Sequence, residues 1–222
     1  MKKITVKQIA LLGVFAAAAY AVMFATRWLP PLIPAVPFLK YDPKDVIIAI
    51  CGFIFGPLPA LAVAVVVSLI EMITVSGTGF IGLLMNVLST AAFVCPAALI
   101  YSKKRSIGGA IVGLVSGTVL MCIVMLLWNY IVTPIYMGYP REAVAELLLP
   151  AFLPFNLIKA IINAALTLLI YKPLVIALRK AHLLPESPAG EKGAKRPWGI
   201  LIFALVLLAT ATLLILIFNH II

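Results

Sequence analysis

Long apolar runs, separated by short polar segments, make up most of this chain. Apolar stretches of about 20 residues match the thickness of a bilayer, and the strand-like alternation of a β-barrel is absent. The expected helices cover residues 5–28, 45–56, 59–75, 79–101, 107–133, 147–177 and 198–222. The pattern therefore predicts an all-α polytopic membrane protein.

Proline, glycine and clustered charge set most of the expected boundaries. Gly56-Pro57 ends the second helix, SGTG follows the third, SKKRS ends the fourth and Thr133-Pro134 ends the fifth. The second helix is short, because about 12 residues at 1.5 Å each span roughly 18 Å, less than the ~30 Å hydrocarbon core. We expect it to begin or end inside the bilayer.

We divide the chain into three parts: a six-helix core (1–180), a basic cytoplasmic linker (181–197) and a C-terminal transmembrane segment (198–222). The last segment is expected to be a lipid anchor. The core carries no evident inverted repeat of the kind that many secondary transporters use.

The placement of charge predicts the orientation of the helices. The net charge is +10, and basic clusters precede the first helix and follow the fourth and sixth. Basic residues beside membrane spans mark the cytoplasmic side, where anionic lipid is the expected partner. The N-terminus is therefore expected in the cytoplasm, with six alternating crossings of the cell membrane. The only basic residues in the outer loops between these helices are Arg27, Lys40, Lys44 and Arg141.

Several classes of function are disfavoured by what the sequence lacks. No soluble segment is long enough for a basic, aromatic nucleic-acid surface. Cys51, Cys95 and Cys122 are isolated inside apolar runs with no metal-ligand spacing, so we expect them to be small buried apolar residues. The sequence has no GxxxxGK[ST] phosphate loop, no HExxH motif and no Ser/His/Asp constellation. An enzyme is not expected.

The segment LPFNLIKAIIN (153–163) places polar groups in an otherwise apolar helix. Asn156, Lys159 and Asn163 fall at i, i+3 and i+7, close to one helical face. A lysine at the centre of a spanning helix costs roughly 2.5–3.5 kcal/mol, so it indicates a functional site. The alternative is a lysine that extends to the membrane surface or pairs with an acidic residue elsewhere in the bundle.

Other helices carry polar residues at a similar depth. Asn129, Asn86 and Glu71 lie one to two turns from the outer ends of their helices, which places them with Asn156 and Lys159 roughly 6–12 Å below the outer surface. The inner halves of these helices are nearly free of polar groups, with Asn163 the main exception. Because a pore needs polar lining throughout, the pattern predicts an outward-facing pocket with an apolar floor.

The residue types in this pocket favour a largely neutral ligand. Carboxamides both donate and accept hydrogen bonds, which suits hydroxyls, ring carbonyls and ring nitrogens. Clustered arginines, which an obligate phosphate or carboxylate would favour, are absent. Aromatic residues that could flank a flat ring are Phe80, Trp128, Tyr130, Tyr136 and Phe155.

The first helix carries small residues every four positions: Gly13, Ala17, Ala21 and Ala25. Small residues at this spacing let helices approach closely in lipid, which predicts a docking face for a partner helix. Packing inside the same bundle is the alternative.

The order and spacing of several segments resemble the substrate-binding S-components of energy-coupling factor (ECF) vitamin transporters, most closely the riboflavin-specific members. The resemblance covers about residues 5–178. The segments that carry it are PFLKYDPKDV, GFIFGPLPALAVAVVVSLI, SGTGFIGLLMNVLS, WNYIVTPIYMG, LPFNLIKAIINAAL and YKPL.

The resemblance implies a six-helix S-component bundle in the plasma membrane of a prokaryote, with riboflavin as the transported ligand and no resident cofactor. Asn129, Asn156 and Lys159, with Asn86 less directly, match the family's polar positions, and Lys40, Tyr41 and Asp42 match its lid loop. The face at Gly13, Ala17 and Ala21 would meet the transmembrane coupling subunit. Two ATPase subunits would hydrolyse ATP and drive toppling of the S-component in the membrane.

Two features depart from the family pattern. A glutamate is expected near Leu83, so one polar contact is either missing or moved to Glu71. The segment 198–222 exceeds six helices. Another vitamin, FMN, a self-sufficient carrier or channel, and a membrane scaffold without a small ligand stay open as alternatives.

Overall fold

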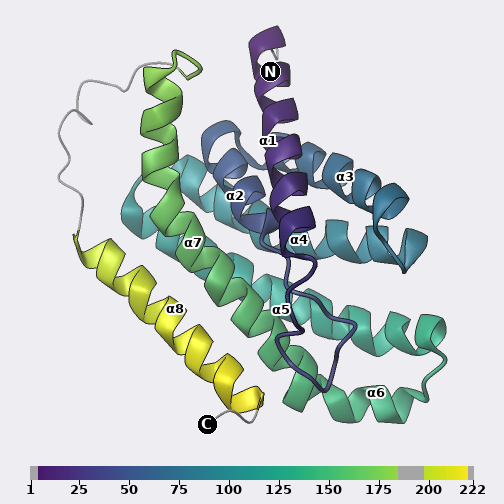
Figure 1. Ribbon diagram of the computed structural model, residues 1–222. Helices are drawn as coiled ribbons and strands as arrows, with labels where there is room; N and C mark the ends of the chain where they lie inside the picture. The colour runs from purple at the N-terminus through teal and green to yellow at the C-terminus, as the bar shows by residue number, and fades with distance from the viewer. Residues whose placement is uncertain (1–4, 185–197, 220–222) are drawn as a thin grey trace.

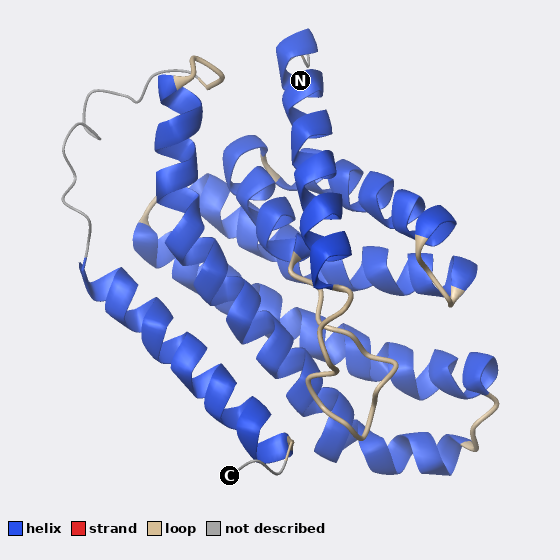
Figure 2. Cartoon of the chain, viewed as in Figure 1, coloured by secondary structure: helices blue, strands red, loops and turns tan. Residues whose placement is uncertain are grey.

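The computed structural model describes residues 5–184 and 198–219 (Figure 1). All regular structure in these two ranges is helical, as the sequence predicts (Figure 2). The elements are α1 (Val6–Thr26), α2 (Lys44–Phe55), α3 (Pro57–Thr74), α4 (Gly79–Lys103), α5 (Ile107–Met137), α6 (Arg141–Leu147), the π-helical turn η1 (Leu148–Phe152), α7 (Leu153–Lys180) and α8 (Trp198–Phe218).

The helices confirm the predicted polytopic membrane architecture. Six helical segments among the described residues are long and apolar enough to cross a membrane: α1, α3, α4, α5, the continuous run from α6 through α7, and α8. The short α2 is not one of them, in line with its predicted length. It lies inside the bundle instead, with Ile48, Ala49, Ile50 and Cys51 fully buried.

Two predicted boundaries were wrong. The fifth helix does not end at Thr133-Pro134 but continues to Met137, where Gly138 adopts a left-handed conformation (φ 68°) and its N–H bonds the Pro134 carbonyl. A proline this close to a helix end removes only one backbone hydrogen bond. The sixth helix does not begin near 147, because α6 and η1 extend the helical path outward from Arg141.

A row of glycines brings α5 against the backbone of α4. A Cβ added to Gly117 would lie 2.1 Å from the Phe93 carbonyl oxygen, and one added to Gly113 would lie 2.8 Å from the Ala97 carbonyl oxygen. No side chain fits at either position without a shift of backbone. Small residues four apart therefore form an internal helix contact here, the arrangement known from helix pairs in membranes.

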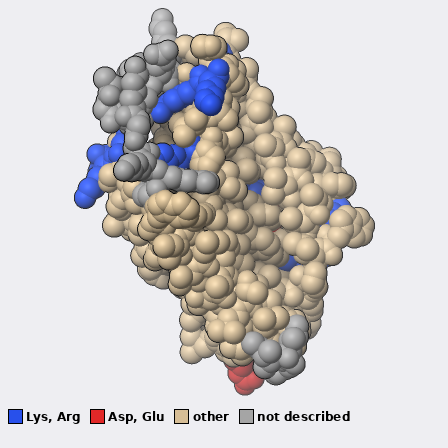
Figure 3. Space-filling model, turned by 60° about the vertical axis from the view of Figure 1, so that its left-hand side comes forward, with Lys and Arg blue, Asp and Glu red and all other residues tan. Residues whose placement is uncertain are grey.

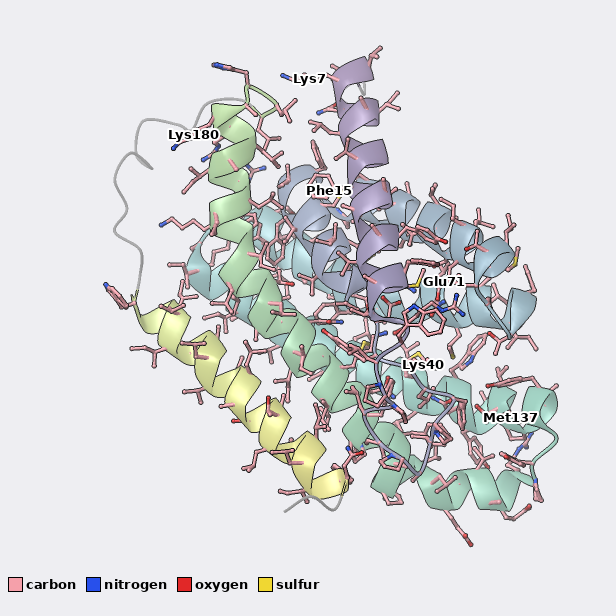
Figure 4. All side chains as sticks on the ribbon, in the orientation of Figure 1. Lys7, Phe15, Lys40, Glu71, Met137 and Lys180 are labelled. Carbon is pink, nitrogen blue, oxygen red and sulfur yellow. The ribbon has the colours of Figure 1, made fainter. Side chains whose placement is uncertain are left out.

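The basic ends of the chain lie together. The Lys7 ammonium donates a hydrogen bond to the carbonyl of His182, which joins the start of α1 to the segment after α7. Figure 4 places Lys7 and Lys180 at one end of the molecule and Lys40 and Met137 toward the other. On the side of the molecule drawn in Figure 3, Lys and Arg side chains gather mainly near one end. This arrangement fits the predicted orientation, in which basic termini and loops share one side.

The loop between α1 and α2, residues 27–43, covers the opposite end of the bundle (Figure 2). Its apolar side chains Ile33, Val36 and Leu39 are buried against α6, η1 and α7. Phe38 packs on Phe152 with ring centroids 6.0 Å apart. Although it contains little regular structure, this outer loop is a packed part of the fold.

Candidate ligand-binding site

Buried polar groups from α2, α4 and α7 meet beneath the outer loop. The Lys159 ammonium on α7 lies 3.3 Å from Oδ2 of Asp45 on α2 and 3.5 Å from the hydroxyl oxygen of Ser89 on α4. Thr90 donates a 2.6 Å hydrogen bond to the other Asp45 oxygen, Oδ1. Asp45 is fully buried and Lys159 nearly so. The predicted intramembrane lysine is thus held inside the bundle by a buried carboxylate.

A second ionic group lies where the outer loop enters α2. The Lys44 ammonium pairs with Asp42 of the loop and with Glu71 of α3, at 2.6 Å from the Glu71 Oε2. The backbone N–H of Lys44 also donates to the Asp42 carboxylate at 2.9 Å. Lys44 is 1% exposed, so the desolvated ammonium depends on these two acids. The group fastens the loop to α3.

Tyr41 connects the outer loop to α7. Its hydroxyl donates a 2.9 Å hydrogen bond to Oδ1 of Asn163. Burial, with the nearby Asp45 and Asp42 carboxylates, raises the pKa of the Tyr41 phenol above its ordinary value. The phenol therefore stays protonated and remains a donor. Asn163, which the sequence set apart as an exception in the inner half, belongs to this polar cluster.

Asn129 and Asn156 are buried, and each bonds within its own helix. The Asn129 amide donates to the Met125 carbonyl at 2.7 Å and accepts from the Thr133 hydroxyl at 3.0 Å. The Asn156 amide donates to the Phe152 carbonyl at 2.8 Å. The amide oxygen of Asn156 can still accept a hydrogen bond, and its second amide hydrogen can still donate one. Asn129 lies two turns from the end of α5, deeper than predicted, because α5 is longer than predicted.

Two predicted residues lie at the margin of the cluster. Asn86 is half-buried on α4, and no hydrogen bond joins its side chain to another described residue. Lys40 is exposed, and its ammonium lies 3.5 Å from the Arg27 carbonyl oxygen of the same loop. The structure therefore groups Tyr41, Asp42, Glu71 and Lys159 with the ionic cluster and leaves Lys40 outside it.

The sequence reasoning missed four members of the cluster. From the sequence, Lys44 is predicted only as a loop charge and Asp45 only as the start of a helix, and Ser89 and Thr90 are not singled out. A signal was available for Asp45, because a carboxylate at the start of a buried helix needs a partner. The acidic contact expected near Leu83 has no counterpart there, and Glu71 instead pairs with Lys44.

Two buried side-chain donors lack an acceptor among the described residues: Nδ2 of Asn163, in the polar cluster, and Nε1 of Trp128, which precedes Asn129 on α5. Unpaired buried donors are rare and costly, at about 1–3 kcal/mol each. Both are well suited to a ligand that offers oxygen or nitrogen acceptors.

Aromatic side chains from α2, α4 and α7 pack together toward the inner end of the bundle. Phe53 of α2 stacks on Tyr101 of α4 at 4.4 Å between ring centroids, and it meets Tyr171 of α7 edge-on at 5.4 Å. The two tyrosine hydroxyls share a 2.8 Å hydrogen bond. Tyr101 and Tyr171 lie in the inner helix halves, where the sequence predicts the apolar floor of the pocket.

On the outer side, a cavity of about 450 Å³ opens between the outer loop and the α5–α6 connection. Ala35, Pro37 and Phe38 line it from the loop, and Met137 and Leu147 are among the residues on the other wall. Its size is in the range of small-molecule pockets, about 300–1,000 Å³. The cavity lies outside the ionic cluster, and none of the predicted binding residues lines it.

The small-residue stripe of α1 faces outward. Gly13, Ala17, Ala21 and Ala25 are all exposed, whereas the other face of α1 buries Phe15, Ala19 and Met23. A Cβ added to Gly13 would meet no atom within 4 Å. Packing of this stripe inside the same bundle, the alternative to a docking face, is therefore absent in the described structure.

Fold and site together define a polytopic membrane protein with a buried polar cluster under an outer loop. The sequence profile of the family described as "ECF transporter, substrate-specific component" matches residues 7–171. The chain belongs to this family of ECF transporter S-components, as its resemblance predicted.

Named relatives and a solved structure agree with this assignment. The chain is 31% identical over 180 residues to the riboflavin transporter RibU of Staphylococcus aureus, covering 78% of this chain and 93% of that protein. It is 28% identical over 191 residues to the riboflavin transporter FmnP of Bacillus subtilis, covering 80% and 98%. A solved S component of a bacterial ECF transporter superposes with a TM-score of 0.66 at 31% identity, covering 78% and 98%.

Proposed function

We propose that this chain binds riboflavin at the polar cluster beneath the outer loop and delivers it inward as the S-component of an ECF importer. The observation that carries the proposal is the pair of unpaired buried donors, Asn163 Nδ2 and Trp128 Nε1. The flavin ring offers carbonyl oxygens and ring nitrogens as acceptors. Relatives named as riboflavin transporters support the choice of ligand.

In this proposal each part of the site has a distinct role. Lys159, Asn129 and Asn156, with Asn86 at the margin, bond the polar edge of the ring and the ribityl chain. Apolar side chains on either side contact the flat faces of the ring. Tyr41, Asp42 and Glu71 hold the loop that covers the bound ligand, and Lys40 acts at the outer surface.

The charges of the cluster favour riboflavin over its phosphate ester FMN. Two buried ammonium groups, Lys44 and Lys159, face three carboxylates, from Asp42, Asp45 and Glu71. An added phosphate would bring further negative charge next to these acids, and like charges in a buried site repel strongly. A neutral flavin avoids this repulsion.

We further infer that transport needs partner subunits. Toward the inner end of the bundle, the aromatic rings of Phe53, Tyr101 and Tyr171 pack against one another. The exposed Gly13–Ala17–Ala21 stripe would contact the transmembrane coupling subunit, and two ATPase subunits would supply the energy. The N-terminus then faces the cytoplasm of a prokaryotic cell, with the ligand loop outside.

The absorption spectrum of the purified protein tests the ligand. Protein from flavin-containing cells should be yellow, with a flavin spectrum, and after the ligand is removed it should bind riboflavin at least tenfold more tightly than FMN. Absence of both copurified flavin and riboflavin binding would overturn the proposal. Uptake into liposomes by this chain alone would contradict the need for partner subunits and favour a self-sufficient carrier.

A further inference from the structure

Helix α8 lies outside the part of the chain that the family profile matches, 7–171, yet it is packed against the core. It runs beside α7, and its less exposed positions recur at alternating spacings of three and four: Leu201, Ala204, Leu208, Ala211, Ile215 and Phe218. Such spacing produces one continuous helical face. Ala204 and Ala211 are completely buried. The rest of α8 presents large apolar side chains outward, as a helix in lipid does.

The C-terminal turns of α8 reach the outer loop. Ala211 belongs to the same buried cluster as Ile33 and Val36 of the loop, and Ile215 packs against that cluster. Beyond the helix end, the Asn219 amide donates a 3.1 Å hydrogen bond to the carbonyl oxygen of Leu32. The same amide nitrogen also lies 2.8 Å from the Ile215 carbonyl oxygen, which fixes its direction.

The outer loop depends on such outside contacts because its own sequence limits internal hydrogen bonding. Four prolines, at 30, 31, 34 and 37, remove backbone donors from this stretch. The internal backbone bonds within residues 30–39 are those of Val36 to Ile33 and Leu39 to Val36. The carbonyl of Leu32 accepts its hydrogen bond from Asn219, which follows the last residue of α8.

The two sides of the loop are supported differently. On one side, the Leu32 carbonyl accepts the hydrogen bond from Asn219, and Ile33 belongs to the buried cluster that also holds residues of α7 and Ala211 of α8. On the other, Ala35, Pro37 and Phe38 border the 450 Å³ cavity against Met137. Figure 1 shows the C-terminal end of α8 and helix α6 on opposite sides of this loop.

We propose that α8 fixes the near edge of the outer loop, with Ala211 and Asn219 as positioning residues, so that the loop opens for the ligand at its α5–α6 edge, where the cavity lies. Ligand exchange is then limited by movement at one edge instead of release of the whole loop. The statement about ligand exchange rests on the proposed riboflavin binding; the contact between α8 and the loop does not.

Two variants of the full chain loosen the contact in different ways. Asn219→Ala removes the donor to Leu32, and Ala211→Leu inserts a bulky side chain into the buried cluster that Ala211 shares with Ile33 and Val36 of the loop. Ala209→Leu is the matched control, because Ala209 is exposed on the same helix. Hydrogen exchange of peptides covering residues 27–43 is measured without ligand, followed by the association and dissociation rates of riboflavin.

In both loosening variants we expect exchange in the loop to be about fivefold faster than in the control, the factor that corresponds to one ordinary hydrogen bond. Exchange in α4 and α5 should be unchanged, and both riboflavin rates should rise together. Unchanged loop exchange, or faster exchange throughout the protein, would overturn the positioning role.

Faster loop exchange with unchanged riboflavin rates would overturn the link to ligand entry. If the wild-type protein binds no riboflavin, the proposed function fails, and hydrogen exchange still decides whether α8 holds the loop. Should Ala211→Leu not fold, Asn219→Ala supplies the same comparison, because it only shortens a partly exposed side chain.

Discussion

The hydroxyl of Tyr41 donates a 2.9 Å hydrogen bond to Oδ1 of Asn163, across 122 positions of sequence. Through this bond the outer loop is tied to the helix that carries Lys159. The same asparagine keeps an unpaired buried donor on its other atom, Nδ2. In the proposed function, loop closure and ligand recognition share one side chain.

Tyr41→Phe should loosen the loop without removing its apolar contacts. The lost hydrogen bond is worth about 1 kcal/mol, so we expect riboflavin to dissociate about fivefold faster. Stopped-flow measurement of flavin fluorescence checks this expectation. An unchanged dissociation rate would show that the Tyr41–Asn163 bond does not hold the loop over the ligand.

The raised pKa of Tyr41 predicts a pH dependence of stability. The folded protein holds the phenolic proton more tightly than the unfolded chain, whose tyrosine pKa is about 10. The resulting stabilisation is complete below about pH 10 and is lost as the pH rises toward the higher folded-state value. Above about pH 10, the free energy of unfolding of the wild type should therefore fall relative to that of Tyr41→Phe. If the difference between these two free energies does not change with pH, the expectation is wrong.

The ion pair of Lys159 and Asp45 allows stability and binding to be separated. Lys159→Met leaves the Asp45 carboxylate buried with Thr90 as its remaining hydrogen-bond donor, which should cost about 3 kcal/mol or more. The double variant Lys159→Met with Asp45→Asn should recover most of this loss, because no unpaired charge remains. Riboflavin affinity should stay at least tenfold weaker in both. Recovery of affinity in the double variant would mean that Lys159 acts only on the fold.

Lys44 and Lys40 are close in sequence but differ in environment. Lys44→Met leaves the Asp42 and Glu71 carboxylates without their shared ammonium, so we expect a loss of about 3–5 kcal/mol in unfolding free energy. Lys40 is exposed, and Lys40→Met should change that free energy by no more than about 0.5 kcal/mol. Denaturation of both detergent-solubilised variants makes the comparison, and equal effects would refute the structural role given to Lys44.

The small-residue stripe of α1 predicts a variant that binds but does not transport. Ala17→Leu enlarges an exposed position, so riboflavin affinity and stability of the isolated chain should be unchanged. Uptake in cells that express the coupling and ATPase subunits should fall at least tenfold, because the close helix approach is blocked. Ala209→Leu, the same change at an exposed position of α8, should transport normally. Full uptake by Ala17→Leu would exclude this stripe as the docking face.

Most of the fold could be predicted because a bilayer leaves few choices to an apolar chain. Helix number, the short α2 and the breaks at Gly56 and around residues 76–79 follow from hydropathy and backbone chemistry. The end of α5 could not be predicted from the proline, because Pro134 costs one backbone hydrogen bond whether the helix stops there or continues past it. The left-handed Gly138 sets the end instead.

The site could be predicted only in part. Lys159 and the buried asparagines can be recognised from the sequence, because they are polar residues in apolar helices. The partners of Lys44 and Lys159 could not be assigned, because Glu71 and Asp45 are brought to them by packing across distant helices. Hydropathy treats Lys40 and Lys44 alike, although only the second is enclosed by acids.

The glycine contacts between α4 and α5 also bear on how this protein can move. With the Gly117 backbone directly against the Phe93 carbonyl, α4 and α5 touch backbone to backbone and no side chain separates them. This helix pair carries Asn86, Ser89 and Asn129. If the molecule tilts in the bilayer, we expect this helix pair to move as one unit. The residues that it places around a bound ligand would then keep their relative positions.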